Sequence, residues 1–191
     1  MFILDQNLRI RYWACFDNCT LNSSREKEGD TTIQKIVNNR SRYQPVADST
    51  RVPWYVIGVI HSMEASLNFK CHLHNGDPLN ARTIHVPAGR PLAGDPPFTW
   101  EYSATDAIRL QDLDRWNDWS VPGICYQLEK YNGTGYRAHH INSPYLWGSS
   151  NQYTSGKYVQ DGVFSPTAVS GQIGAMVLLK LMNGKGMIRI G

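Results

Sequence analysis

The stretch that decides the fold is VPWYVIGVIHSMEASLNFKCHLHNGDPLNART, residues 52–83. Its first half is apolar on nearly every side of a helix, and Pro53 suits the first helical turn, which needs no backbone N–H donor. The apolar run is far shorter than the ~20 residues that cross a bilayer, so we expect a buried central helix. Glu64 lies near the end of this helix, and a polar turn with Asp77 and Thr83 follows it.

Helical periodicity recurs on both sides of this stretch. Helices are predicted at residues 6–21, 31–46, 99–116, 121–133 and 167–182. Prolines and glycines exclude helix between residues 72 and 98 and favour short strands, with TIHV at 83–86 as the best candidate. We therefore predict an α+β fold, mainly α, with a buried central helix and a small β-hairpin lobe. A length of 191 residues predicts a single domain over residues 1–191.

The charge pattern excludes one class of function. The net charge is +3, and Lys and Arg are scattered along the chain instead of clustering. A dedicated nucleic-acid binder gathers its basic side chains on one face, so we expect no nucleic-acid partner. A mildly basic surface still favours approach to an anionic polymer.

The position of Glu64 suggests acid chemistry. The helix dipole and burial both disfavour a carboxylate at the C-terminal end of an apolar helix, so both are expected to raise the pKa of Glu64. A raised pKa suits a general acid near neutral pH. Asp77 lies in the polar turn HNGDP, and two carboxylates in unlike environments are the arrangement that glycosidases use. The alternatives are a solvated Glu64, an Asp77 that only organises its turn, and a Thr83 that is an ordinary strand residue.

These residues resemble a known family. A Glu at the end of a buried helix, followed by an Asp and, six residues later, a Thr, is similar to the lysozyme superfamily and especially to phage-type muramidases (endolysins). The segment GDPLNART resembles their hairpin in layout. The resemblance implies that Glu64 is the general acid, Asp77 the partner carboxylate and Thr83 the hydroxyl that positions water. The implied substrate is peptidoglycan, cleaved at the β-1,4 bond between N-acetylmuramic acid and N-acetylglucosamine.

The resemblance also sets expectations about cofactors, partners and location. It implies no metal or organic cofactor, no membrane insertion and a monomeric enzyme. No secretory signal is readable in MFILDQNLRIRYW, since Asp5 interrupts it at once. We therefore expect synthesis in the cytoplasm and action on the cell wall after release or dedicated export.

Side chains that suit sugar rings crowd the segment 136–158 and the helix before it. Aromatic rings offer a flat apolar face with a polar tip, and Asn and Gln reach N-acetyl and hydroxyl groups. The residues expected to bind substrate are His74, Gln127, Tyr131, Tyr145, Trp147, Asn151 and Tyr153. The alternative is a surface loop anchored by its own aromatics. Glu101 is the alternative second carboxylate if Asp77 is structural, while its position favours a role as the cap of its own helix.

Other functions remain open from the sequence. Three histidines, His61, His72 and His74, together with Glu64 could bind zinc in a metallo-hydrolase, although the HxxE spacing is not the HExxH of zinc proteases. The same fold could act as a chitinase, a chitosanase or a lytic transglycosylase. A catalytically silent cell-wall-binding module is the alternative from another class.

Overall fold

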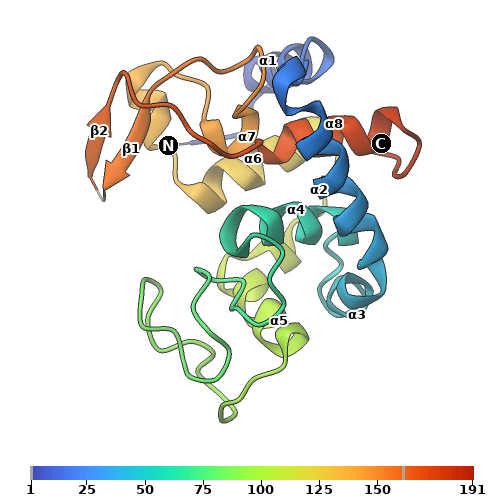
Figure 1. The fold of residues 1–191 in the computed structure, drawn as a ribbon, viewed down its shortest axis with the longest axis vertical. Coiled ribbons are helices and arrows are strands. Elements are labelled where there is room, and N and C mark those ends of the chain that lie inside the picture. The colour runs from blue at the N-terminus through green and yellow to red at the C-terminus, as the bar shows by residue number, and fades with distance from the viewer. Residues whose placement is uncertain (1, 161) are drawn as a thin grey trace. The chain divides into compact units, whose positions relative to one another are not determined.

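The computed structural model describes residues 2–160 and 162–191, and these residues form a mainly helical chain with one small antiparallel sheet (Figure 1). The predicted class, α+β and mainly α, is confirmed. The chain divides into two compact units. Unit 1 is Met1–Ile33 with Asp118–Gly191, and unit 2 is Gln34–Asn117. The expectation of one domain over residues 1–191 stays a prediction.

Unit 1 consists of helices and the sheet. Its elements are α1 (Gln6–Asp17), the 3-10 turn η1 (Ser23–Arg25), the first part of α2 (Glu26–Asn38), α6 (Val121–Asn132), η3 (Gly135–His139), α7 (Pro144–Trp147), β1 (Lys157–Gln160), β2 (Val163–Ser165) and α8 (Ala175–Gly184). The start of α6 follows the sequence signals, because Ser120 caps it and Pro122 lies in its first turn. The closing helix is shorter than predicted and begins only after Gly174, where a side chain would collide with the Leu146 carbonyl.

Unit 2 contains residues 52–83, the apolar helix and the polar turn that follows it. Its elements are the remainder of α2, then α3 (Arg40–Thr50), α4 (Trp54–Ala65), α5 (Trp100–Leu110) and the 3-10 turn η2 (Leu113–Arg115). The single helix predicted at 31–46 is in fact two helices, which meet at Asn39. The backbone of Asn39 leaves helical geometry, and its side-chain amide donates to the carbonyl of Lys35.

The core of unit 2 is built around α4, as predicted. Val56, Ile57, Val59 and Ile60 are completely buried. Gly58 permits close helix packing, since a Cβ at this position would lie 2.6 Å from the Ile36 side chain. Burial of each large aliphatic side chain stabilises the fold by roughly 1.5–3 kcal/mol. This packing fixes the position of the C-terminal end of α4, which carries Glu64.

The sheet does not follow α4. The antiparallel strands β1 and β2 lie at 157–165, with Tyr158 opposite Phe164. The predicted strand at 83–86 is wrong, because residues 66–99 contain no strand and form a long loop between α4 and α5 (Figure 1). The Ile84 and His85 N–H groups bond to a side chain instead of a partner strand. Prolines in the same segment have no N–H to offer a ladder.

Among the described residues, no helix is both long enough and apolar enough to cross a bilayer.

Candidate functional site

Glu64 lies in the last turn of α4 and is half-buried. The helix ends at Ala65, and Ser66 follows in the left-handed conformation with φ of 50°. The polar turn then packs directly onto the helix end. A Cβ at Gly76 would lie 2.8 Å from the carbonyl oxygen of Glu64, and the φ of Gly76 is +81°. Only glycine meets both conditions without strain, so the HNGD turn lies against the residue predicted to be the acid.

Asp77, the next residue, is 6% exposed and organises the loop that follows. Its Oδ2 accepts from the backbone N–H groups of Ile84 at 2.8 Å and His85 at 3.0 Å, and from the Asn75 amide at 3.1 Å. Its Oδ1 accepts from Nδ1 of His85 at 2.6 Å. Burial alone would raise the pKa of Asp77, but the bonds from His85 and Ile84 outweigh burial and lower it to about 2. Asp77 is therefore ionised and fully hydrogen-bonded.

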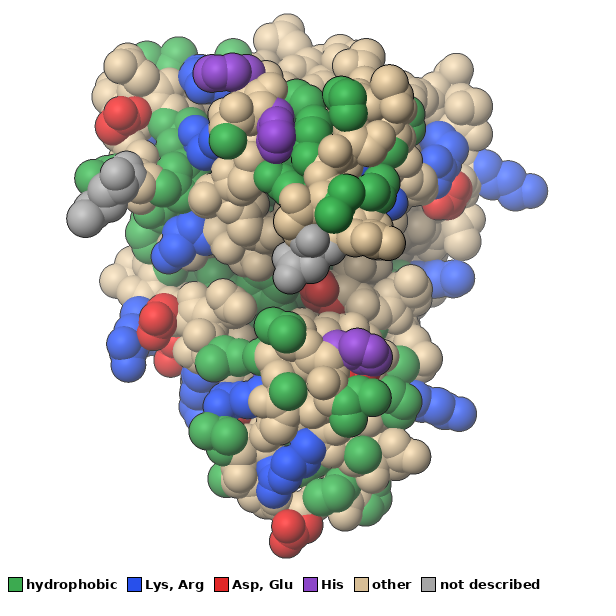
Figure 2. Space-filling view, turned by 90° about the vertical axis from the view of Figure 1, so that its left-hand side faces the viewer, with side chains coloured by type: hydrophobic (Ala, Val, Ile, Leu, Met, Phe, Trp, Pro, Cys, Tyr) green, Lys and Arg blue, Asp and Glu red, His purple; other side chains and the backbone are tan. Residues whose placement is uncertain are grey.

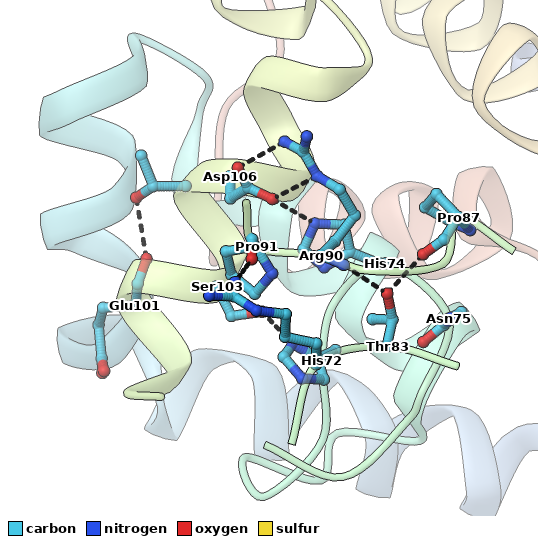
Figure 3. Close-up of polar contacts among 12 residues, drawn as sticks. His72, His74, Asn75, Thr83, Pro87, Arg90, Pro91, Glu101, Ser103 and Asp106 are labelled. Atoms are coloured by element: carbon cyan, nitrogen blue, oxygen red, sulfur yellow. Dashed lines mark hydrogen bonds and ion pairs between the residues drawn. The ribbon is translucent and has the colours of Figure 1, made fainter. Parts of the chain in front are cut away.

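Thr83 is held inside the same loop and is 3% exposed. Its hydroxyl donates to the Pro87 carbonyl at 2.5 Å and accepts from the Arg90 N–H at 2.9 Å (Figure 3). Its own N–H bonds to the Arg90 carbonyl at 2.9 Å. The hydroxyl of Thr83 therefore acts as both donor and acceptor within the loop, as expected for a structural residue. The water-positioning role of Thr83 stays a prediction.

A charged cluster joins this loop to α5. Arg90 forms a two-point ion pair with Asp106, with its Nη2 2.5 Å and its Nε 2.9 Å from the carboxylate oxygens. His74 reaches the same carboxylate at 2.8 Å through Nε2 (Figure 3). Burial, together with the nearby His72 and Arg90, lowers the pKa of His74 in spite of the Asp106 carboxylate. His74 was expected to bind substrate, yet its side chain is 0% exposed, so it connects the turn to α5.

The other two histidines that were considered as zinc ligands, His72 and His61, also form hydrogen bonds within the fold. Nε2 of His72 donates to the Ala81 carbonyl at 2.8 Å, because a carbonyl can only accept, and its Nδ1 accepts from Ser103 at 2.7 Å. His61 is fully buried, and its Nδ1 lies 3.1 Å from the Tyr43 hydroxyl. Burial lowers the pKa of His61 to about 4. Within residues 2–160 and 162–191, no three His, Cys, Asp or Glu side chains are grouped as metal ligands.

Glu101, the alternative second carboxylate, lies in the first turn of α5 and pairs with Arg42 of α3. Thr99 is the N-cap and accepts from the Tyr102 N–H at 3.3 Å. Burial raises the pKa of Glu101, but the hydrogen bond from Arg42, a backbone hydrogen bond and the charge of Arg42 together outweigh burial, so the pKa is lowered. Glu101 is thus stabilised by the dipole of α5 and by its ion pair with Arg42, which is typical of a structural carboxylate.

The remaining residues expected to bind substrate all lie in unit 1. Gln127 and Trp147 are 4% and 2% exposed and so offer a ligand little surface. Asn151 is exposed, but its amide bridges the Thr20 N–H and the Asn18 carbonyl, both at 2.9 Å. The Tyr153 hydroxyl donates to the Gly156 carbonyl at 3.1 Å. These side chains hold the 136–158 segment together.

Tyr131 and Tyr145 form an aromatic pair in unit 1, and Tyr145 is 7% exposed. Their rings are stacked with centroids 6.5 Å apart. Tyr145 also lines a groove of about 500 Å³ in unit 1, between the end of α6 and the β1–β2 hairpin. Its other lining side chains include Asn132, Tyr136, Tyr158, Gln160 and Gln172. Tyrosine rings interspersed with amides form a surface suited to sugars.

Several residues of these sites were not expected from the sequence. His85, Arg90 and Asp106 were missed, because His85 was assigned to a strand and the other two are isolated charges in the sequence. Tyr136 and Tyr158 were noted only as members of an aromatic segment. A usable signal was the pairing of Asp77 and His85 across a loop rich in Pro and Gly, which favours side-chain to backbone bonding.

A comparison of the chain with protein-family models, with curated proteins and with solved structures found no match. The resemblance to the lysozyme superfamily therefore rests on the residues themselves.

Proposed function

We propose that the protein is a peptidoglycan-cleaving glycoside hydrolase, a muramidase in which Glu64 is the general acid. The observation that carries the proposal is the setting of Glu64. It is half-buried at the end of an apolar helix, and the HNGD turn lies against its backbone carbonyl. An acid held at the rim of a packed core, with the ionised Asp77 in the turn that packs against its helix end, suits the protonation of a glycosidic oxygen.

The groove in unit 1 supports a saccharide ligand. Among its tyrosines Tyr158 is half-buried and the other two are 7% exposed, while Asn132, Gln160 and Gln172 carry amides that can bond N-acetyl and hydroxyl groups. Lys157 is the only Lys or Arg in the described lining. A polar and aromatic lining with one positive charge fits an aminosugar polymer better than it fits a nucleic acid, which needs several basic residues. By this proposal the site of action is the cell wall, reached after release or export.

In the reaction, Glu64 donates its proton to the bridging oxygen as the bond to the anomeric carbon breaks. Asp77 stays ionised beside it, where its charge favours the positive character that develops on the sugar. The residues Asn75, Ile84 and His85 hold Asp77 in place. Chitin or chitosan is the alternative substrate, since both share the β-1,4 aminosugar bond.

The proposal is tested by the loss of turbidity of purified cell walls. Glu64→Gln should abolish lysis, because the amide has the same shape but no proton to donate. Asp95→Asn is the control for removing a carboxylate from unit 2, because the Asp95 side chain is 99% exposed. Glu101→Gln tests the alternative carboxylate and should keep lysis. Unchanged lysis in Glu64→Gln contradicts the proposal.

Two further measurements separate the alternatives. Lysis that persists in a chelator excludes a metallo-hydrolase that uses His61, His72 and His74. Binding to walls without release of reducing ends favours the silent wall-binding module, for which the groove in unit 1 is the supporting observation. Anhydro ends in the product indicate a lytic transglycosylase.

A further inference from the structure

His85 and Asp77 form a dyad with one buried and one exposed partner. Nδ1 of His85 lies 2.6 Å from Oδ1 of Asp77, and the exposed fractions of the two side chains are 75% and 8%. An ionised carboxylate can only accept, so in the neutral form of the ring Nδ1 carries the hydrogen. The other ring nitrogen, Nε2, then has a free lone pair directed away from the bond.

The loop backbone fixes this imidazole in place. The N–H groups of Ile84 and His85 both bond to Oδ2 of Asp77, and the Asn75 amide donates to the His85 carbonyl at 2.9 Å. The neighbouring side chains nevertheless point into solvent, with Ile84 76% and Val86 89% exposed. Figure 2, which views the side where this loop lies in Figure 1, shows hydrophobic side chains and a histidine on the surface of unit 2. A rigid backbone thus displays Ile84, His85 and Val86 outward.

The dyad lies at the Glu64 end of α4. The contact of Gly76 with the Glu64 carbonyl places the turn there, and Asp77 is the next residue. Asp77 itself is a poor proton acceptor, because four hydrogen bonds occupy its oxygens and its pKa is about 2. The basic lone pair beside it belongs to His85.

We propose that His85, oriented by Asp77, is the general base that activates water for attack on the anomeric carbon. The proposal rests on the proposed glycosidase function and assigns its water-activating group. Nε2 takes one proton from water while the water oxygen bonds to the anomeric carbon. The bond from that carbon to the bridging oxygen breaks, and the bridging oxygen takes the proton of Glu64. Solvent then carries the proton of His85 back to Glu64. Attack by water from the opposite face inverts a β bond, so the first product is the α-anomer.

The sharpest variant is His85→Asn. The Asn amide can occupy the place of Nδ1 and keep an N–H donor to Asp77, but it carries no basic nitrogen. We expect kcat to fall by about a hundredfold or more, as for loss of a general base, with KM and the thermal midpoint unchanged. Added azide should restore turnover and give a glycosyl azide of α configuration, because azide attacks without deprotonation. His140→Asn, an exposed histidine of unit 1, is the matched control.

Asp77→Asn provides a second variant. Its amide oxygen can still accept the two backbone N–H groups, while its NH₂ group faces Nδ1 of His85. The imidazole must then accept at Nδ1 and carry its hydrogen on Nε2, which removes the base while the loop remains formed. This variant should lose kcat to a similar extent and should also respond to azide.

The outcomes separate this inference from the proposed function. If Glu64→Gln is inactive but His85→Asn keeps the kcat of the unsubstituted protein, the base assignment is overturned and the acid assignment stands. A β-anomer or an anhydro sugar as first product also overturns it, because neither arises from direct attack by activated water. If the unsubstituted protein cleaves no glycan, the proposed function fails, and this inference fails with it.

Discussion

Removal of the Asp77 carboxylate should destabilise the loop that follows α4. In Asp77→Ala the donors of Ile84, His85 and Asn75 lose an acceptor to which they lie at 2.6–3.1 Å. Hydrogen bonds to charged groups contribute about 1.5–3 kcal/mol each. The freed Asn75 and His85 side chains can turn to water, so most of the loss comes from the two backbone N–H groups. We expect a destabilisation of about 3 kcal/mol, and of about 1 kcal/mol in Asp77→Asn, which keeps one acceptor oxygen.

The assay is urea unfolding of the unsubstituted protein and both variants between pH 7 and pH 2. The folded state lowers the pKa of Asp77 from 3.8 to about 2. Its stabilisation is therefore fully present above pH 3.8 and is lost as the pH falls through about 2. The difference in the free energy of unfolding between the unsubstituted protein and Asp77→Ala should therefore decrease as the pH falls from 3.8 to about 2. Surface substitutions without structural consequence change the free energy of unfolding by at most about 0.5 kcal/mol. A change this small in Asp77→Ala at pH 7 would refute the reasoning.

Three further predictions concern other parts of the fold. Gly76→Ala should cost more stability than Gly89→Ala and should reduce lysis, because both have positive φ but only the Gly76 Cβ would strike the Glu64 carbonyl; equal unfolding midpoints would contradict this. In unit 1, Glu129 of α6 forms an ion pair with Arg137 at 2.7 Å, and the side chain of Glu129 is buried while that of Arg137 is partly exposed. Glu129→Gln should therefore destabilise unit 1 by about 2 kcal/mol in urea unfolding, which is less than the roughly 3–5 kcal/mol for breaking a fully buried pair; an unchanged unfolding midpoint would contradict this. His61→Phe should flatten the pH dependence of stability between 6.5 and about 4, where unfolding of the unsubstituted protein takes up a proton at the buried imidazole; an unchanged slope counts against this.

Local signals in the sequence predicted the helices well. The continuous apolar run after Pro53 indicated α4, and Ser120, Pro122 and Gly133 marked the two ends of α6. These signals act within one or two turns of backbone, so no knowledge of the rest of the chain is needed. The break at Asn39 was missed, because Ile33, Ile36 and Tyr43 keep an apolar period through it.

The structure of the loop at residues 66–99 and the lining of the groove in unit 1 depend on contacts between residues that are not neighbours in the sequence, and a local sequence pattern does not reveal such contacts. The segment TIHV alternates apolar and polar residues as a strand does. Its Ile84 and His85 N–H groups nevertheless donate to the side chain of Asp77, seven and eight residues earlier in the sequence. An aromatic residue suits a core and a sugar equally well, so the sequence could not show that Tyr145 lines the groove while Trp147 does not. His85 was missed for the same reason, because its partner lies across the loop. The placement of Glu64 at the end of a buried helix was predictable, since one helix determines it.

The central claim is that Glu64 protonates a glycosidic oxygen of peptidoglycan. The most direct measurement is the analysis of sugar ends released from purified peptidoglycan by the protein and by Glu64→Gln at equal concentration. The claim predicts reducing N-acetylmuramic acid ends from the unsubstituted protein and none above background from the variant. Release of the same ends by Glu64→Gln at an undiminished rate would contradict it.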